Sequence, residues 1–472
     1  MGLEHEPDAH CPADRGRGLR SVLGAAAAVA LLFTTGCASS DGFSLPKIDD
    51  INPFLKKEAP LAGKRMPIME ATGSIANTLA PADRPILLPA QVAVESWSQP
   101  GGNASNVPGH ATFSATPKQA WSADAGSGSH KQGKVTAPPI VYDGRVYTLD
   151  AAARVSAFAV NGGSTVWRTS MVPDSERKAG SMFSISGSST GGGYGGGLAA
   201  EGGRLFVATG YGTVSALDPK TGKVLWTKTL GAPVRAAPTA VVDRVVVITA
   251  DGRATALSAN DGSELWSAKG LAEQASLIGS PSPAIEGNLV VVPFPSGELL
   301  GLKLTDGEQI WNEGLSTTKG ASAMGALSDA ARPAIDGGVV FAAAHGGRTT
   351  ALQARSGERI WSAAVGGTQG PVVAGDNVFV AGANGQLVAL NRRTGQTLWT
   401  AKLPDSNVWS GPVLAGGQLW LVSGRGAMVG VDGTTGRIVT QVSLGAPAYV
   451  PPIVAGGRLY VLTDNARLIA FN

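Results

Sequence analysis

The chain has 472 residues with 65 glycines, 29 prolines and only 15% charged residues, and its hydrophobic fraction of 43% excludes a disordered chain. Its formal net charge is +3 and it has no basic cluster, which argues against a nucleic-acid-binding protein. Both cysteines, Cys11 and Cys37, precede the body of the chain, so the body has no disulfide framework and no cysteine metal site. Glycine and proline are spread along the chain, which favours short strands joined by turns over long helices.

The first segment has the pattern of an export signal. Three arginines within residues 15–20 precede an apolar run over residues 22–33, which is too short for a comfortable membrane-spanning helix. We therefore expect a signal peptide over residues 1–36. Residues 34–37 read Thr-Thr-Gly-Cys and resemble a bacterial lipobox. This resemblance implies lipidation of Cys37, and the alanine that follows it implies sorting to the outer membrane.

The next segment carries no sustained hydrophobic period. Residues 37–93 are rich in proline, alanine and lysine, so we expect a flexible, lipidated tether. Residues 94–472 then form the folded domain.

This domain is built from repeats of one unit. Each unit has a strand led by Pro or Gly, two further strands separated by short turns, and a strand that ends in tryptophan. Most intervals between these tryptophans are near the ~40–50 residues that a four-stranded propeller blade takes. The second strands are expected at residues 145–149, 204–208, 244–248, 288–292, 338–342, 377–381, 418–422 and 458–462. The structural tryptophans are Trp121, Trp167, Trp226, Trp266, Trp311, Trp361 and Trp399, and Val439 stands at the seventh place among the units that follow Trp121.

The two ends of the domain complete one unit between them. The last unit stops one strand short at residues 468–472, and residues 120–121 supply a matching tryptophan strand before the first full unit. A linear solenoid or two β-sandwiches would not require this split repeat. We therefore predict an all-β fold, an eight-bladed β-propeller with four-stranded antiparallel blades, whose last blade is closed by both termini.

Candidate catalytic motifs lack the context that their chemistry needs. Residues 187–191 match the pattern G-x-S-x-G, but no helix follows this glycine- and serine-rich tract over residues 186–197. The tract also lacks the Lys-Ser/Thr of a phosphate-binding loop, and a tight inner strand lining a propeller channel explains it better. The body holds three histidines, His110, His130 and His345, which are not at metal-ligand spacing. We expect no catalytic, cofactor-binding or metal-binding residues.

A resemblance to a known family adds to this interpretation. Residues 216–226, with the sequence ALDPKTGKVLW, resemble the tryptophan-docking repeat of quinoprotein-type propellers. Two functional classes share that repeat: the PQQ-dependent dehydrogenases and the BamB lipoproteins of the outer-membrane β-barrel assembly (BAM) machinery. The order of signal, cysteine, tether and eight blades is similar to the BamB family. That likeness implies a non-enzymatic scaffold on the periplasmic face of the outer membrane, which binds a POTRA domain of the insertase BamA.

The same resemblance points to two loops as the partner-binding surface. One family loop reads Leu-x-Leu-Arg-Gly before a Ser/Ala-Pro pair, and residues 275–281 keep two of its positions but lack the arginine. The next family loop carries Asp-x-Asp, of which residues 328–333 keep one aspartate. An apolar pair would suit the centre of an interface, whereas ordinary inter-blade turns are the alternative. The residues implied in BamA binding are Leu277, Ile278, Gly279, Ser280, Asp329 and Arg332.

Three further possibilities stay open at the level of sequence. Exposed blade edges could pair with unfolded β-barrel substrates by β-augmentation. The chain could instead be a periplasmic PQQ-dependent dehydrogenase, which added PQQ, Ca²⁺ and a dye acceptor would reveal. It could also be a propeller that binds a carbohydrate or peptide, for which a ligand in the central channel would be the sign.

Overall fold

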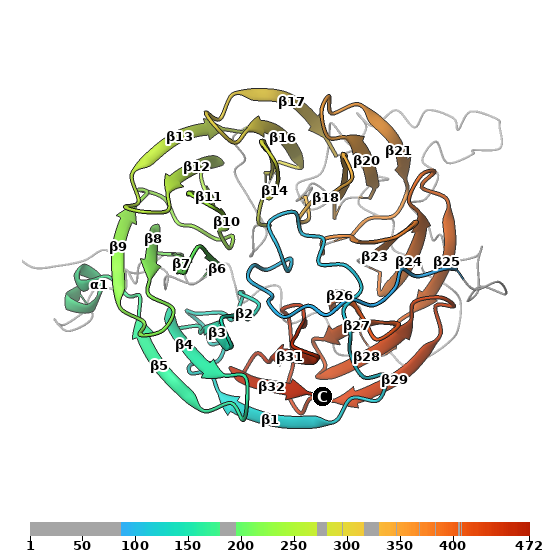
Figure 1. Ribbon diagram of the computed structural model, residues 1–472, viewed down its shortest axis with the longest axis horizontal. Helices are drawn as coiled ribbons and strands as arrows, with labels where there is room; N and C mark the ends of the chain where they lie inside the picture. Colours follow the sequence, from blue (N-terminus) through green and yellow to red (C-terminus); the bar gives the residue numbers. More distant parts are fainter. Residues whose placement is uncertain are drawn as a thin grey trace, which may run out of the picture. The chain divides into compact units, whose positions relative to one another are not determined.

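The computed structural model describes residues 86–179, 195–270, 281–294, 296–315, 330–345, 347–367, 369–382, 384–404, 406 and 408–472. Within these residues the strands form eight four-stranded antiparallel sheets. Figure 1 shows the sheets arranged as blades around a central axis. The predicted eight-bladed β-propeller is therefore confirmed.

The strands follow one another from the axis to the rim within each blade. Blade 1 is β2 (Ile140–Tyr142), β3 (Arg145–Leu149), β4 (Arg154–Ala159) and β5 (Thr165–Ser170), and blade 2 is β6 (Gly196–Glu201), β7 (Arg204–Thr209), β8 (Thr213–Leu217) and β9 (Val224–Thr229). Blade 3 is β10 (Thr239–Val241), β11 (Arg244–Thr249), β12 (Arg253–Ser258) and β13 (Glu264–Lys269), and blade 4 is β14 (Ala284–Glu286), β15 (Leu289–Pro293), β16 (Glu298–Lys303) and β17 (Gln309–Gly314). Blade 5 is β18 (Ala334–Asp336), β19 (Val339–Ala343), β20 (Thr349–Gln353) and β21 (Arg359–Ala363), and blade 6 is β22 (Val372–Ala374), β23 (Asn377–Ala381), β24 (Gln386–Asn391) and β25 (Thr397–Lys402). Blade 7 is β26 (Trp409–Ala415), β27 (Gln418–Ser423), β28 (Ala427–Asp432) and β29 (Ile438–Ser443), and blade 8 is β30 (Ile453–Ala455), β31 (Arg458–Leu462), β32 (Arg467–Phe471) and β1 (Gln119–Asp124).

Blade 8 joins the two ends of the ring. Strand β1 pairs antiparallel with β32, and Trp121 lies opposite Ala470. The outermost strand of this blade therefore comes from the start of the domain, as the split repeat predicted.

The packing follows from the sequence of each strand. The inner three strands of a blade are short, rich in valine, leucine and alanine, and almost wholly buried. The outermost strands instead alternate between exposed and partly buried residues, because only one of their faces contacts a neighbouring blade. Apolar clusters fill the spaces between adjacent blades, so that each blade is stabilised by both of its neighbours.

The described residues include one short helix, α1 (Asp174–Ala179), between blades 1 and 2. No helix among them has the length and apolar character needed to cross a membrane.

The segment before β1 closes one end of the central channel. Residues 94–111, here called the plug, run across the middle of the ring, where they are the blue loop of Figure 1. The plug exchanges backbone hydrogen bonds with the innermost strands of blades on all sides of the axis. These bonds are Gly456 N to Val94 O, Trp97 N to Val141 O, Ala200 N to Ser98 O, Ile285 N to Ala104 O, Ile335 N to Ser105 O and Ala111 N to Leu414 O.

Candidate functional site

Six of the eight blades are fastened to the next by the tryptophan of their outermost strand. The indole ring lies against a glycine in the last turn of the following blade, and its Nε1 donates a hydrogen bond to the carbonyl oxygen three residues before that glycine. The six donor–acceptor pairs are Trp121–Val160, Trp167–Pro219, Trp226–Ala259, Trp266–Leu304, Trp311–Ala354 and Trp361–Arg392, with distances of 2.7–3.1 Å. The ring covers the turn because the glycine has no side chain.

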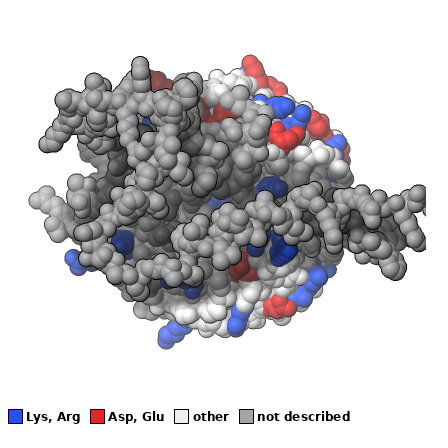
Figure 2. Space-filling model, turned by 180° about the vertical axis from the view of Figure 1, so that it is seen from behind, with Lys and Arg blue, Asp and Glu red and all other residues white. Residues whose placement is uncertain are grey.

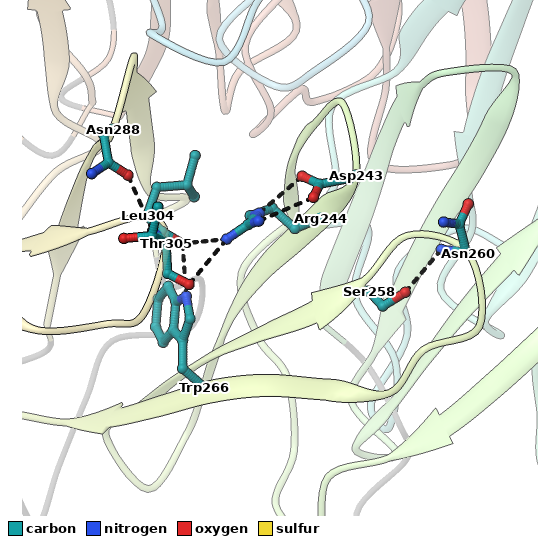
Figure 3. Close-up of polar contacts among 8 residues, drawn as sticks. All are labelled: Asp243, Arg244, Ser258, Asn260, Trp266, Asn288, Leu304 and Thr305. Atoms are coloured by element: carbon teal, nitrogen blue, oxygen red, sulfur yellow. Dashed lines mark hydrogen bonds and ion pairs between the residues drawn. The ribbon is translucent and has the colours of Figure 1, made fainter.

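The contact between blades 3 and 4 shows the arrangement in detail (Figure 3). Trp266 Nε1 donates to the Leu304 carbonyl at 2.8 Å, and Arg244 Nη1 donates to the same oxygen at 2.7 Å. The Arg244 guanidinium is held in turn by both carboxylate oxygens of Asp243. A Cβ on Gly307 would lie 2.7 Å from the Trp266 ring, at a φ of +76°. Only glycine fits there without displacement of the ring or the turn.

Two blades depart from this pattern. Trp399 packs on Gly436 and is fully buried, but its Nε1 has no hydrogen-bond partner among the described residues. In blade 7 the strand register places Thr440, not Val439, at the tryptophan position, because Thr440 lies opposite Gly430 as Trp399 lies opposite Ala389. The assignment of Val439 to this place was therefore wrong by one residue, and Val439 faces solvent with 56% of its surface exposed.

The missing tryptophan has a structural reason. The docking glycine of each acceptor blade lies in the turn between its third and fourth strands. In blade 8 these strands are β32 and β1, the two ends of the domain, so no turn connects them. An indole at Thr440 would have no turn glycine to cover.

The end of the channel away from the plug forms a pocket of about 580 Å³. Most of its wall residues lie just before or at the start of the innermost strands of seven blades. His345 and Asp464, which follow the second strands β19 and β31, and Pro100 of the plug also line it. Figure 2 shows the molecule from behind, with lysine and arginine side chains visible both at the rim and toward the middle of this view. The pocket wall itself contains Lys134, Arg235 and Arg332.

Arg332 stands out among the pocket residues. Protein atoms surround its guanidinium, and the resulting desolvation lowers its pKa to about 10. Some of its surface still faces the channel. Among the described residues, no hydrogen bond or ion pair holds this guanidinium, in contrast to Arg392, which pairs with Asp336.

The predicted partner-binding residues fall largely outside the described part of the chain. Cys37, Leu277, Ile278, Gly279, Ser280 and Asp329 all lie outside the described residues. The described residues at the ends of the two loops are Pro281 of the first, with Ser282 directly after it, and Ala330 to Arg332 of the second. Both sets line the same channel pocket. The described flanks of the two loops therefore meet at one mouth of the channel.

The remaining candidates have mainly structural positions. His110 is buried, with Nδ1 2.8 Å from the Pro89 carbonyl oxygen and Nε2 accepting a hydrogen bond from Gly417 N. His345 lines the channel pocket, and His130 lies in a turn. Of the glycine tract, residues 186–194 lie outside the described residues, and β6 begins at Gly196 as an inner strand. Within the described ranges, no group of three or more His, Cys, Asp or Glu residues could hold a metal ion.

Sequence reasoning missed the plug and the convergence of cations at the channel mouth. Lys134, Arg235 and Arg332 are far apart in sequence and belong to different blades. The periodicity of the repeat identifies the strands but gives no signal for the side chains that share the axis.

Comparison with known proteins agrees with the eight-bladed propeller described above. Residues 151–401 and 383–472 match the family model described as "Outer membrane protein assembly factor BamB". The BamB of Burkholderia pseudomallei is 28% identical over 200 residues, which is 42% of this chain and 46% of that protein. The chain spans less than half the length of the curated relatives it matches first.

Solved structures show the same fold at lower identity. BamB from Moraxella catarrhalis superposes with a TM-score of 0.64 at 19% identity, covering 76% of this chain and all of that one. A europium-containing methanol dehydrogenase superposes with a TM-score of 0.62 at 17% identity, covering 78% and 89%. These two likenesses concern the fold alone, whereas the family model covers more than half of the sequence. The chain belongs to the family of repeat propellers described as outer membrane protein assembly factor BamB.

Proposed function

We propose that this chain is a non-enzymatic scaffold of the BAM complex that binds a POTRA domain of BamA and assists the insertion of β-barrel proteins. In this proposal residues 1–36 are a signal peptide, Cys37 carries the lipid, and residues 37–93 tether the propeller to the periplasmic face of the outer membrane. Membership of the family supports the assembly role.

One observation supports the choice of the two candidate loops as the binding surface. Ser282, directly after the first candidate loop, and Ala330 to Arg332 of the second line a single channel mouth. Loops on neighbouring blades 4 and 5 can thus present one continuous surface to a partner domain. The apolar pair Leu277 and Ile278 would supply the centre of that surface.

An affinity purification tests the proposal. Tagged protein is isolated from detergent-solubilised envelopes, and co-purifying proteins are identified by mass spectrometry. We expect BamA in the eluate, and we expect joint replacement of Leu277 and Ile278 by Asp to reduce its recovery. Val242→Asp is the matched control, because Val242 is 81% exposed and belongs to neither candidate loop. Recovery of BamA that is unaffected by the double replacement would place the interface elsewhere.

The lipid anchor has its own test. Cys37→Ala should release the protein into the soluble periplasmic fraction, whereas Cys11→Ala should leave it in the membrane fraction. A Cys37→Ala protein that stays with the membrane would contradict anchoring through this residue.

Direct contact with unfolded substrates is a second element of the proposal. The outermost strands β9 and β17 stand at the end of their sheets, and each exposes an apolar residue beside its tryptophan, Leu225 and Ile310. An extended substrate strand could pair with such an edge. Photo-crosslinkers at these two positions should capture β-barrel precursors, and capture of BamA alone would argue against strand pairing.

A further inference from the structure

The channel mouth has the form of a cup. The plug closes the channel from one end, and Pro100 of the plug forms part of the pocket lining. Most of the remaining wall comes from the starts of inner strands, which hydrogen bonding holds in place in each sheet. A volume of about 580 Å³ is in the range of small-molecule sites.

The charged groups in this cup are mostly positive. Lys134, Arg235 and Arg332 line it, and Asp464 is the one carboxylate among the described lining residues. Asp464 accepts a hydrogen bond from Ser129 Oγ. Cations that converge on a confined space reinforce one another's potential, because protein walls screen them less than open water does.

Two hydrogen-bonding groups in the cup have no partner among the described residues. The guanidinium of Arg332 forms no hydrogen bond or ion pair there, although protein atoms desolvate it. The Nδ1 atom of His345 is buried and unsatisfied. An uncompensated, desolvated cation is costly, and an anion that accepts its N–H groups would offset that cost.

The rest of the lining indicates the kind of anion. Apolar residues such as Val135, Ala237, Ala331 and Val450 separate the polar groups. An inorganic ion would leave most of the volume and these apolar surfaces unused. A carbon frame would contact them while its anionic groups reach different cations.

We propose that this channel mouth binds a small organic polyanion, a compound that carries two or more carboxylate or phosphate groups on a compact carbon frame. Arg332 forms a forked contact with one anionic group, since its planar N–H donors match carboxylate and phosphate oxygens. Arg235 and Lys134 contact the others. The site shares the channel mouth with residues of the proposed BamA contact, and Arg332 belongs to both. Its binding test uses the protein without BamA.

Isothermal titration calorimetry at low ionic strength tests the proposal on the full-length protein. Citrate is the carboxylate probe, 2,3-bisphosphoglycerate is the phosphate probe, and triethyl citrate is the uncharged control. We expect both polyanions to bind and triethyl citrate to give no heat, and the tighter of the two is the preferred probe for the variants. Absence of heat from both polyanions at about 1 mM would overturn the proposal.

Matched variants separate a built site from general charge attraction. Arg332→Gln should weaken binding of the preferred polyanion at least tenfold, and Arg332→Lys should restore part of it. Arg393→Gln removes the same charge from an exposed turn outside the pocket and should leave binding unchanged. Equal weakening by Arg332→Gln and Arg393→Gln would overturn the proposal. Thermal unfolding of each variant verifies its fold, and Arg235→Gln provides a second pocket variant if Arg332→Gln is unstable.

Discussion

The docking of a tryptophan on a turn glycine predicts a specific cost for adding one methyl group. In Gly307→Ala the new Cβ would lie 2.7 Å from the Trp266 ring, and the residue would keep a φ of +76°. The left-handed backbone costs alanine about 1–2 kcal/mol, and overpacking against the ring adds about 1–3 kcal/mol. We expect a total loss of about 2–5 kcal/mol in the free energy of unfolding.

A matched glycine isolates the part of this cost that the ring causes. Gly338 has nearly the same φ, +77°, but a Cβ there would meet nothing within 4 Å. Gly338→Ala should therefore lose only the backbone contribution, about 1–2 kcal/mol. Equilibrium unfolding in urea measures both variants against the unchanged protein.

A double-mutant cycle then tests the contact itself. Once Trp266→Ala has removed the ring, Gly307→Ala should cost about as much as Gly338→Ala. The reasoning is refuted if Gly307→Ala and Gly338→Ala differ by less than about 0.5 kcal/mol in the protein that retains Trp266.

Three other predictions follow from the hydrogen bonds and burial described above. In urea unfolding, Trp226→Phe should destabilise the protein by about 1 kcal/mol more than Trp266→Phe. In Trp266→Phe the Leu304 carbonyl oxygen still accepts a hydrogen bond from Arg244. In Trp226→Phe no other described donor reaches the Ala259 carbonyl oxygen. Burial raises the pKa of Tyr147 to about 12, above its usual value of 10.0. The buried neutral side chain therefore makes its full contribution to the free energy of unfolding below pH 10, and this contribution is lost as the pH rises to about 12. Tyr147→Phe should therefore flatten the decline of the urea midpoint over this pH interval. Asn106→Gly should destabilise the protein by about 1–3 kcal/mol and speed amide exchange in the plug, because the Asn106 side chain donates to carbonyls of blades 4 and 5.

Each of these has an outcome that would contradict it. Equal costs for the two Trp→Phe variants would mean that the second donor to the Leu304 carbonyl is unimportant. An unchanged alkaline profile in Tyr147→Phe would assign that decline to other groups, such as Tyr460, whose pKa is also raised by burial. Unaltered exchange in Asn106→Gly would show that the backbone bonds alone hold the plug.

The sequence by itself determined the architecture of this protein. Strand positions, the number of blades and the closure of blade 8 by β1 and β32 all agree with the repeat pattern. The reason is that each blade is a local unit, in which alternating apolar residues form strands and glycine-containing turns join them. Even there, the one-residue error at Val439 arose because blade 7 lacks the tryptophan that marks the register, and a slip of one residue reverses the face of a strand.

Only the tertiary structure decided what lies at the axis. Asn106 bonds to Pro283 and Pro333, residues that are remote in sequence, and Arg332 shares a pocket with cations of other blades. Such contacts depend on how eight blades surround a common centre, and no local pattern of residues records which side chains meet there. The repeat pattern therefore predicts the ring, whereas the plug and the cationic cup can be identified only from the assembled tertiary structure.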